Sequence, residues 1–135
     1  MRCAALFLAL AFCVSALGLS SQDNHKRNTP CKTPENAKTC YWTHGRLSAG
    51  NGTPSFRLWK IGTDRILGID SGPSVHREGS LDNEYPELPA NLVRKFKPSE
   101  NRVFADFEIC PLEPERLGEM QGACIESAKN IVVEK

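Results

Sequence analysis

The residue types best suited to binding a ligand alternate along two neighbouring runs of the chain. Trp42, His44 and Arg46 occupy every second position of the first run, and Arg57 and Trp59 do so in the second. Side chains two positions apart on a β-strand point to the same face. Aromatic rings offer a large contact area, and arginine binds carboxylates through two parallel hydrogen bonds. If the runs pair in a hairpin, the five side chains form a platform for a glycan, an anionic small molecule or a peptide.

A structural role for the same residues is the alternative. Trp59 would then belong to the core beside Ile61, and both arginines would pair with acidic residues of a neighbouring strand, Asp106 and Glu108. The outward placement of the platform depends on the register of the hairpin, because a slip of one residue would reverse every side chain.

A second candidate for chemistry is the run from Leu67 to Gly72, LGIDSG. Apolar residues followed by Asp-Ser-Gly resemble the active-site loop of aspartic proteases, in which two aspartates share one proton. The resemblance implies a homodimer, since a chain of this length would supply only one such residue, Asp70. The alternative is a strand that ends in a tight turn, where Asp, Ser and Gly are common. We therefore assign no catalytic residue.

The histidines suggest a metal site only weakly. His25, His44 and His76 would need Asp70 or Glu78 as a further ligand, and their spacing matches no ligand motif. Histidines that face solvent are the simpler explanation of the pattern. We expect neither a metal nor a cofactor.

The first residues favour export. A single basic residue, Arg2, precedes a short apolar run that ends in small residues, as in a secretory signal peptide. We expect a signal peptide over 1–21, a polar N-terminal segment over 22–40, a single β domain over 41–135, and a secreted or periplasmic location without a membrane span. Residues 22–135 carry 16 basic and 16 acidic side chains, since the 17 basic residues lose only Arg2. This balance gives no general attraction to nucleic acid.

Four cysteines follow the predicted signal peptide: Cys31, Cys40, Cys110 and Cys124. An even number in an exported domain predicts two disulfides. Of the three pairings that the sequence allows, we favour Cys31 with Cys40 and Cys110 with Cys124, because each pair brackets a short loop that contains proline. A zinc site with four thiolates is the alternative, but the close spacing typical of such sites is missing.

The spacing of apolar and turn residues predicts an all-β fold. Strands are expected over 41–49, 55–61, 65–69, 101–110 and 120–128, with residues 131–133 as a final edge strand or tail. Residues 70–98 contain four prolines and show no periodicity, apart from one short helix expected just after Pro89. Five or six antiparallel strands with one minor helix, held by disulfides, form a sandwich or a small barrel.

Two runs carry a further resemblance, HGRLSAGNGTPSFRLWKIGTDRILGI and FADFEICPLEPERLGEMQGACIESAKNIVV. They resemble small secreted bacterial proteins of unassigned function. The Gly-Arg-Leu, Asn-Gly-Thr-Pro and Leu-Trp pattern is also similar to the opening hairpin of prealbumin-like (transthyretin-like) β-sandwiches, which implies a fold and no activity. We expect an exported, non-catalytic binding or structural module. The alternative is a small hydrolase, an aspartic-protease-like homodimer that uses Asp70.

Overall fold

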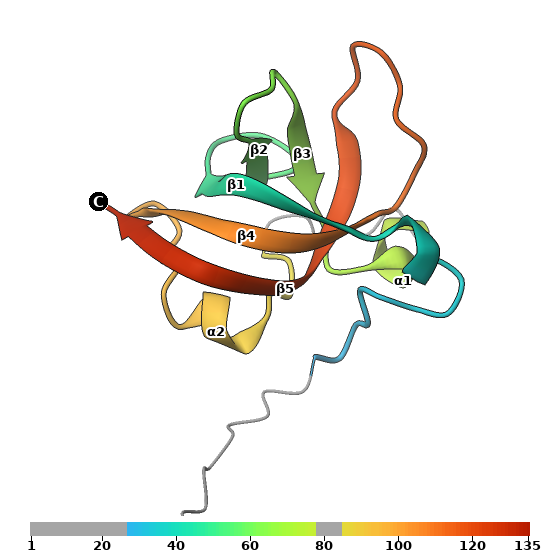
Figure 1. The fold of residues 1–135 in the computed structure, drawn as a ribbon, viewed down its shortest axis with the longest axis horizontal. Coiled ribbons are helices and arrows are strands. Elements are labelled where there is room, and N and C mark those ends of the chain that lie inside the picture. Colours follow the sequence, from blue (N-terminus) through green and yellow to red (C-terminus); the bar gives the residue numbers. More distant parts are fainter. Residues whose placement is uncertain (1–26, 78–84) are drawn as a thin grey trace, which may run out of the picture.

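Five strands form one sheet that closes into a barrel in the order β1-β2-β3-β5-β4 (Figure 1). The computed structural model describes residues 27–77 and 85–135. Neighbouring strands are antiparallel except β3 and β5, which run parallel. The prediction of an all-β fold is therefore confirmed, with a barrel rather than a sandwich. The strands are β1 (Tyr41–Ala49), β2 (Phe56–Lys60), β3 (Ile66–Ile69), β4 (Arg102–Pro111) and β5 (Gln121–Glu134).

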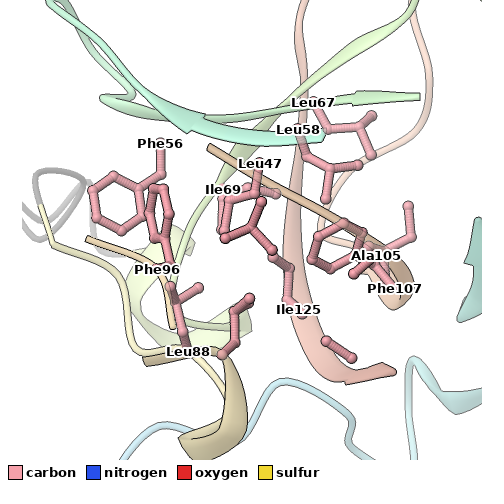
Figure 2. Packing of buried hydrophobic residues seen from close by; sticks show 14 of the residues in the cluster. Leu47, Phe56, Leu58, Leu67, Ile69, Leu88, Phe96, Ala105, Phe107 and Ile125 are labelled. Atoms are coloured by element: carbon pink, nitrogen blue, oxygen red, sulfur yellow. The ribbon is translucent and has the colours of Figure 1, made fainter. Parts of the chain in front are cut away.

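The core fills the barrel, and on β1, β2 and β4 one parity of each strand supplies it, as the alternation predicts. Leu47 of β1 faces Leu58 of β2, and both are fully buried together with Phe107 of β4. Figure 2 shows how these side chains meet inside the barrel. Because inward positions are apolar, the residues between them in sequence must point outward.

Two short helices accompany the barrel, and one of them packs against its core. The helix expected after Pro89 is present as α2 (Ala90–Val93), and its Leu92 is buried in the core with Phe96. The Asn91 side chain ties α2 to β5 through a hydrogen bond of 2.7 Å to the carbonyl of Ala128. A second helix, α1 (Pro73–Arg77), was not predicted, because proline fits a first helical turn but no apolar periodicity follows it. A single 3-10 turn, η1 (Ala37–Thr39), precedes β1.

The last strand is longer than the sequence indicates. Residues 131–133 do not form a separate strand or tail, because β5 continues along β4 until Glu134 faces Arg102. Lys129 and Asn130 interrupt the apolar alternation, and Asn130 has a positive φ of 54°. The ladder shifts register next to this residue, between Phe104 and Asp106 of β4. A bulge of this kind breaks the period-2 pattern without ending the strand.

Residues 27–40, called the strap below, cross the outer side of β4 and β5 and are held there by two disulfides. Cys31 is bonded to Cys124 and Cys40 to Cys110, with sequence separations of 93 and 70 residues. The pairing favoured from the sequence is therefore wrong. Closeness in sequence is a poor guide here, because the strap lies against β4 and β5. Each strap cysteine therefore meets a cysteine of a strand and not the other cysteine of the strap.

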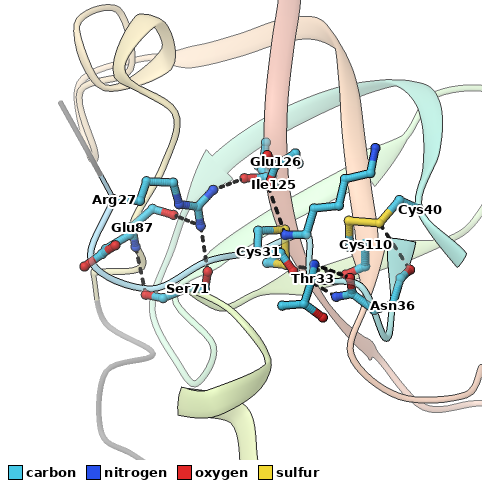
Figure 3. The surroundings of a disulfide bond; sticks show 12 residues. Arg27, Cys31, Thr33, Asn36, Cys40, Ser71, Glu87, Cys110, Ile125 and Glu126 are labelled. Carbon is cyan, nitrogen blue, oxygen red and sulfur yellow. Dashed lines mark hydrogen bonds between the residues drawn. A yellow bond between two sulfur atoms is a disulfide. The ribbon is translucent and has the colours of Figure 1, made fainter. Parts of the chain in front are cut away.

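Arg27 fixes the beginning of the strap (Figure 3). Its guanidinium donates to the carbonyls of Ile125, Ser71 and Glu87, which belong to three separate segments. Burial lowers the pKa of Arg27 below its usual value, although Glu126 and Glu87 counteract this effect. The side chain of Glu87 also accepts hydrogen bonds from the backbone of residues 28 and 29.

Two disulfides indicate an oxidising compartment. The predicted signal peptide over 1–21 and its cleavage region lie outside the described residues. Within 27–77 and 85–135, each helix is too short to cross a bilayer.

Gly68 of β3 provides a test of how the β1–β2 loop packs on the barrel. A Cβ at this position would lie 2.4 Å from Cγ of Pro54, so Gly68→Ala must displace the loop or the strand. We expect a loss of about 1–3 kcal/mol in the free energy of unfolding, measured by guanidinium denaturation with the disulfides intact.

Gly50→Ala is the matched control. Its Cβ would meet no atom within 4 Å, so a change within about 0.5 kcal/mol is expected. Equal stabilities of the two variants would contradict the packing of Pro54 on β3.

Candidate functional site

The predicted platform lies on the outer face of the β1–β2 hairpin. Arg46 of β1 faces Trp59 of β2, and Ser48 faces Arg57. All four alternate with buried residues such as Leu47 and therefore point away from the core. Trp42 and His44 continue this outer face of β1 and are exposed. The register assumed for the platform is thus the one in the structure.

Arg46 lies over the indole of Trp59. The guanidinium carbon is 5.0 Å from the ring centroid, within the range of a cation–π interaction. The indole itself is fixed, because its Nε1 donates a hydrogen bond of 2.7 Å to the carbonyl of Thr63. Arg46 Nε is buried and has no hydrogen-bond partner among the described residues. The pair therefore holds a positive charge on a rigid aromatic surface.

Arg57 lies diagonally across the hairpin from Arg46. Such diagonal neighbours have Cα atoms roughly 7–8 Å apart. Its Nε and Nη2 each donate to a carbonyl of the β1–β2 loop, those of Pro54 and Asn51, at 3.2 Å. Among the ion pairs of the described residues, none involves Arg46 or Arg57. Two guanidinium charges thus share one surface without a carboxylate to neutralise them.

The other end of the platform is electrostatically balanced. Lys129 of β5 lies 4.2 Å from the ring centroid of Trp42, which is 47% exposed. His44 Nδ1 lies 2.9 Å from a carboxylate oxygen of Asp106, and Asn130 donates to the other oxygen at 2.7 Å. The hydrogen bond from Asn130, followed by that with His44, lowers the pKa of Asp106 below its usual value.

The structural alternative for the platform is wrong in its details. Trp59 does not enter the core, since Leu58 and not Trp59 faces inward. Asp106 and Glu108 do lie on the neighbouring strand, but they pair with His44 and Lys32 instead of the arginines.

Sequence reasoning missed the neighbours that β3 and the β4–β5 loop add to the platform. Ile66 of β3 faces Trp59 and is 43% exposed, and Met120 lies close to Gly68. A hollow of about 440 Å³ lies beside them, lined by Asp64, Arg65, Ile66, Leu117, Gly118, Glu119 and Met120. The alternation within β3 was the only sequence signal that Ile66 faces outward. No local pattern predicts the position of Met120, because the long-range parallel pairing of β3 with β5 brings it next to the platform.

Asp70, the candidate from the Asp-Ser-Gly run, lies in the interior. The residue is 5% exposed, and its Oδ2 lies 2.7 Å from Nδ1 of His76. The other ring nitrogen of His76 is 3.7 Å from Glu113, whose carboxylate accepts a hydrogen bond from the backbone of Gly122. Asp70 Oδ1 has no partner among the described residues. This arrangement fixes α1 to the end of β3 and to the β4–β5 loop.

The neighbouring Ser71 is also committed to structure. It is buried, and its hydroxyl accepts a hydrogen bond of 2.8 Å from the backbone of Glu87. The aspartic-protease-like homodimer, in which two copies of Asp70 would share one proton, stays a prediction.

The candidate metal ligands do not assemble. His44 pairs with Asp106 on the barrel wall, whereas His76 pairs with Asp70 beside α1. Glu78 and His25 lie outside the described residues. Over the described part of the chain, no three His, Cys, Asp or Glu side chains are grouped so as to hold a metal ion.

Comparison of the chain with protein-family models, with curated proteins and with solved structures finds no match.

Glu108 of β4, which faces Trp42 of β1, links this strand to the strap. Lys32 Nζ donates to its carboxylate at 2.5 Å and Ser127 at 3.0 Å. The hydrogen bond from Lys32 is the main cause that lowers the pKa of Glu108 below its usual 4.5, and burial partly opposes it. A carboxyl whose pKa is lowered on folding stabilises the fold at pH values above its pKa in the unfolded chain. This contribution is lost as the pH falls through the pKa of the folded state.

We expect Lys32→Ala to raise the pKa of Glu108 towards 4.5, because the main stabilising donor is removed. The measurement is a carbon NMR titration of the Glu108 carboxyl. Lys38→Ala is the control, since this exposed lysine of η1 makes no hydrogen bond or ion pair with Glu108. A Glu108 titration that is the same in both variants would contradict the assignment.

Proposed function

We propose that the chain is an exported, non-catalytic binding module that takes an anionic ligand on the outer face of β1 and β2. The observation that carries the proposal is the pair of guanidinium groups, Arg46 and Arg57, that flank Trp59 without a carboxylate partner among the described residues. Both arginines are half-buried, and arginine pairs with a carboxylate through two parallel hydrogen bonds. A ligand that brings a carboxylate or a sulfate supplies that missing partner.

The charges of the platform favour a ligand with localised negative groups. Arg57 directs two of its donors to loop carbonyls, which holds the guanidinium in one orientation and lowers the entropy lost on binding. Arg46 is positioned by Trp59 in the same way. The near-neutral balance of residues 22–135 argues against a nucleic acid, which needs a broad basic surface.

The aromatic and apolar part of the platform favours an acidic oligosaccharide among the anionic ligands. Trp59 and Ile66 form a continuous outer surface across β2 and β3, beside Met120. Sugar rings present apolar faces that pack on aromatic side chains, while their acidic groups reach the arginines. OB-folds share the five-stranded barrel architecture, and they bind oligosaccharides on the face of their second and third strands. This last point is an analogy of fold and supports the location only.

The proposal is tested by titrating the protein with oligogalacturonate and, in parallel, with neutral cello-oligosaccharides. The Trp42→Phe variant makes Trp59 the only tryptophan, so its fluorescence reports on the platform directly. We expect a shift with the acidic sugar that weakens as salt is added, and none with the neutral one. Binding of an acidic peptide with equal affinity would shift the ligand class from sugar to peptide and contradict the sugar assignment.

Substitutions at the arginines complete the test. We expect Arg46→Ala and Arg57→Ala each to weaken binding by about tenfold or more, since a charge-assisted pair contributes roughly 1.5–3 kcal/mol. Arg46→Lys keeps the charge but loses the planar fork, so its loss should be smaller. Arg94→Ala on the exposed end of α2 is the matched control and should bind normally. If calorimetry shows equal losses of affinity for Arg94→Ala and Arg46→Ala, the ligand is attracted by positive charge anywhere on the surface, and the platform is not its binding site.

A further inference from the structure

The four cysteines of the described chain gather at one point, although they form two separate disulfides. Cys110 of β4 and Cys124 of β5 occupy directly opposite positions of the antiparallel ladder. Each of them is bonded to a different cysteine of the strap, as Figure 3 shows in part. Cys31, Cys110 and Cys124 form one buried cluster, and Cys40 packs against it.

The two strand cysteines are close enough to bond with each other. Directly opposite residues of an antiparallel pair have Cα atoms about 4.5–5.5 Å apart, which lies within the range of a disulfide. The Cys124 sulfur lies 3.7 Å from the carbonyl oxygen of Cys110. A bond between Cys110 and Cys124 would therefore leave the register of β4 and β5 unchanged.

The four cysteines differ in how far they are exposed. Cys31, Cys110 and Cys124 are at most 1% exposed, whereas Cys40 at the start of β1 is only half-buried. Exchange requires a thiolate to reach one sulfur of the disulfide in line with the bond. An external thiolate can approach Cys40, and Cys110 is then the leaving group.

We propose that these cysteines are a thiol–disulfide exchange site, with Cys40 as the point of attack and Cys110–Cys124 as the disulfide that results. In the first step an external dithiol, as its thiolate, bonds to the Cys40 sulfur. The bond between Cys40 and Cys110 breaks, and Cys110 leaves as a thiolate. In the second step the Cys110 thiolate attacks the Cys124 sulfur, and Cys31 leaves as a thiolate that takes a proton from water.

The remaining step restores the balance of electrons. The second thiol of the external dithiol attacks the mixed disulfide on Cys40, which releases Cys40 as a thiol and oxidises the dithiol to its disulfide. One protein disulfide is thus reduced and the other is exchanged. The barrel keeps a covalent link between β4 and β5, and the strap loses both of its own.

The released strap would be held only by non-covalent contacts. These include the hydrogen bonds of Arg27, those from the backbone of residues 28 and 29 to Glu87, and that from the backbone of Lys32 to Glu126. The ion pair between Lys32 and Glu108 adds to them. Keeping the segment ordered costs conformational entropy worth about 1–2 kcal/mol for each residue, and this cost opposes the contacts. The exchange therefore converts a fixed strap into one that can leave the outer side of β4 and β5.

The natural protein is treated with limiting dithiothreitol, quenched with iodoacetamide and mapped by mass spectrometry of its peptides. We expect alkylated Cys31 and Cys40 together with a Cys110–Cys124 disulfide, in about tenfold excess over alkylated Cys110. Alkylated Cys40 and Cys110 with an intact Cys31–Cys124 bond would overturn the exchange step. Alkylation of Cys31 before Cys40 would overturn the assigned point of attack.

The Cys31→Ser, Cys40→Ser double variant tests the geometry separately and needs no reductant. Its two remaining strand cysteines are expected to form a disulfide on air oxidation, with the barrel intact by tryptophan fluorescence. Free thiols in a folded double variant would contradict the proposal. If the double variant does not fold, the Cys40→Ser single variant decides: a Cys110–Cys124 bond supports the exchange, and a retained Cys31–Cys124 bond overturns it.

Discussion

The closed ladder of the barrel is the constraint on which the other features depend. β4 pairs with both β1 and β5, and β5 in turn closes the sheet against β3. Because each strand of the closed barrel is paired on both sides, its register is fixed. Leu47 and Leu58 therefore face inward, and Arg46 and Trp59 face outward. A slip of one residue would bury a guanidinium without a partner, at a cost of several kcal/mol. The platform is thus fixed by the same pairing that forms the core.

The strap is a second layer that the barrel would not retain by packing alone. It contains only a single 3-10 turn, and its buried residue is Cys31. A disulfide that closes a loop of about 100 residues removes about 4.7 kcal/mol of chain entropy from the unfolded state when it acts alone. The two bonds share most of their loops, so their effects are not additive. Together with Arg27, they compensate for the weak packing of a polar segment.

The hairpin and β4 could be predicted from the sequence because their signals are local. The alternation in 41–49 and the turn at Gly50 to Pro54 are enough to define β1, β2 and the outward side chains. The disulfide pairing, the extension of β5 past Asn130 and the place of Met120 could not be predicted. Each depends on contacts between segments far apart in the chain, which leave no periodic pattern in either segment.

The separation of charge on the barrel surface arises from the fold and not from composition. The acidic residues of β4 are hydrogen-bonded to groups brought from other segments, Asp106 to His44 and Asn130, and Glu108 to Lys32. Since those carboxylates are occupied, they are not available to Arg46. A chain with almost equal numbers of acidic and basic residues therefore presents one locally cationic face. That face also carries the ring of Trp59, so it places directional hydrogen-bond donors next to an apolar surface.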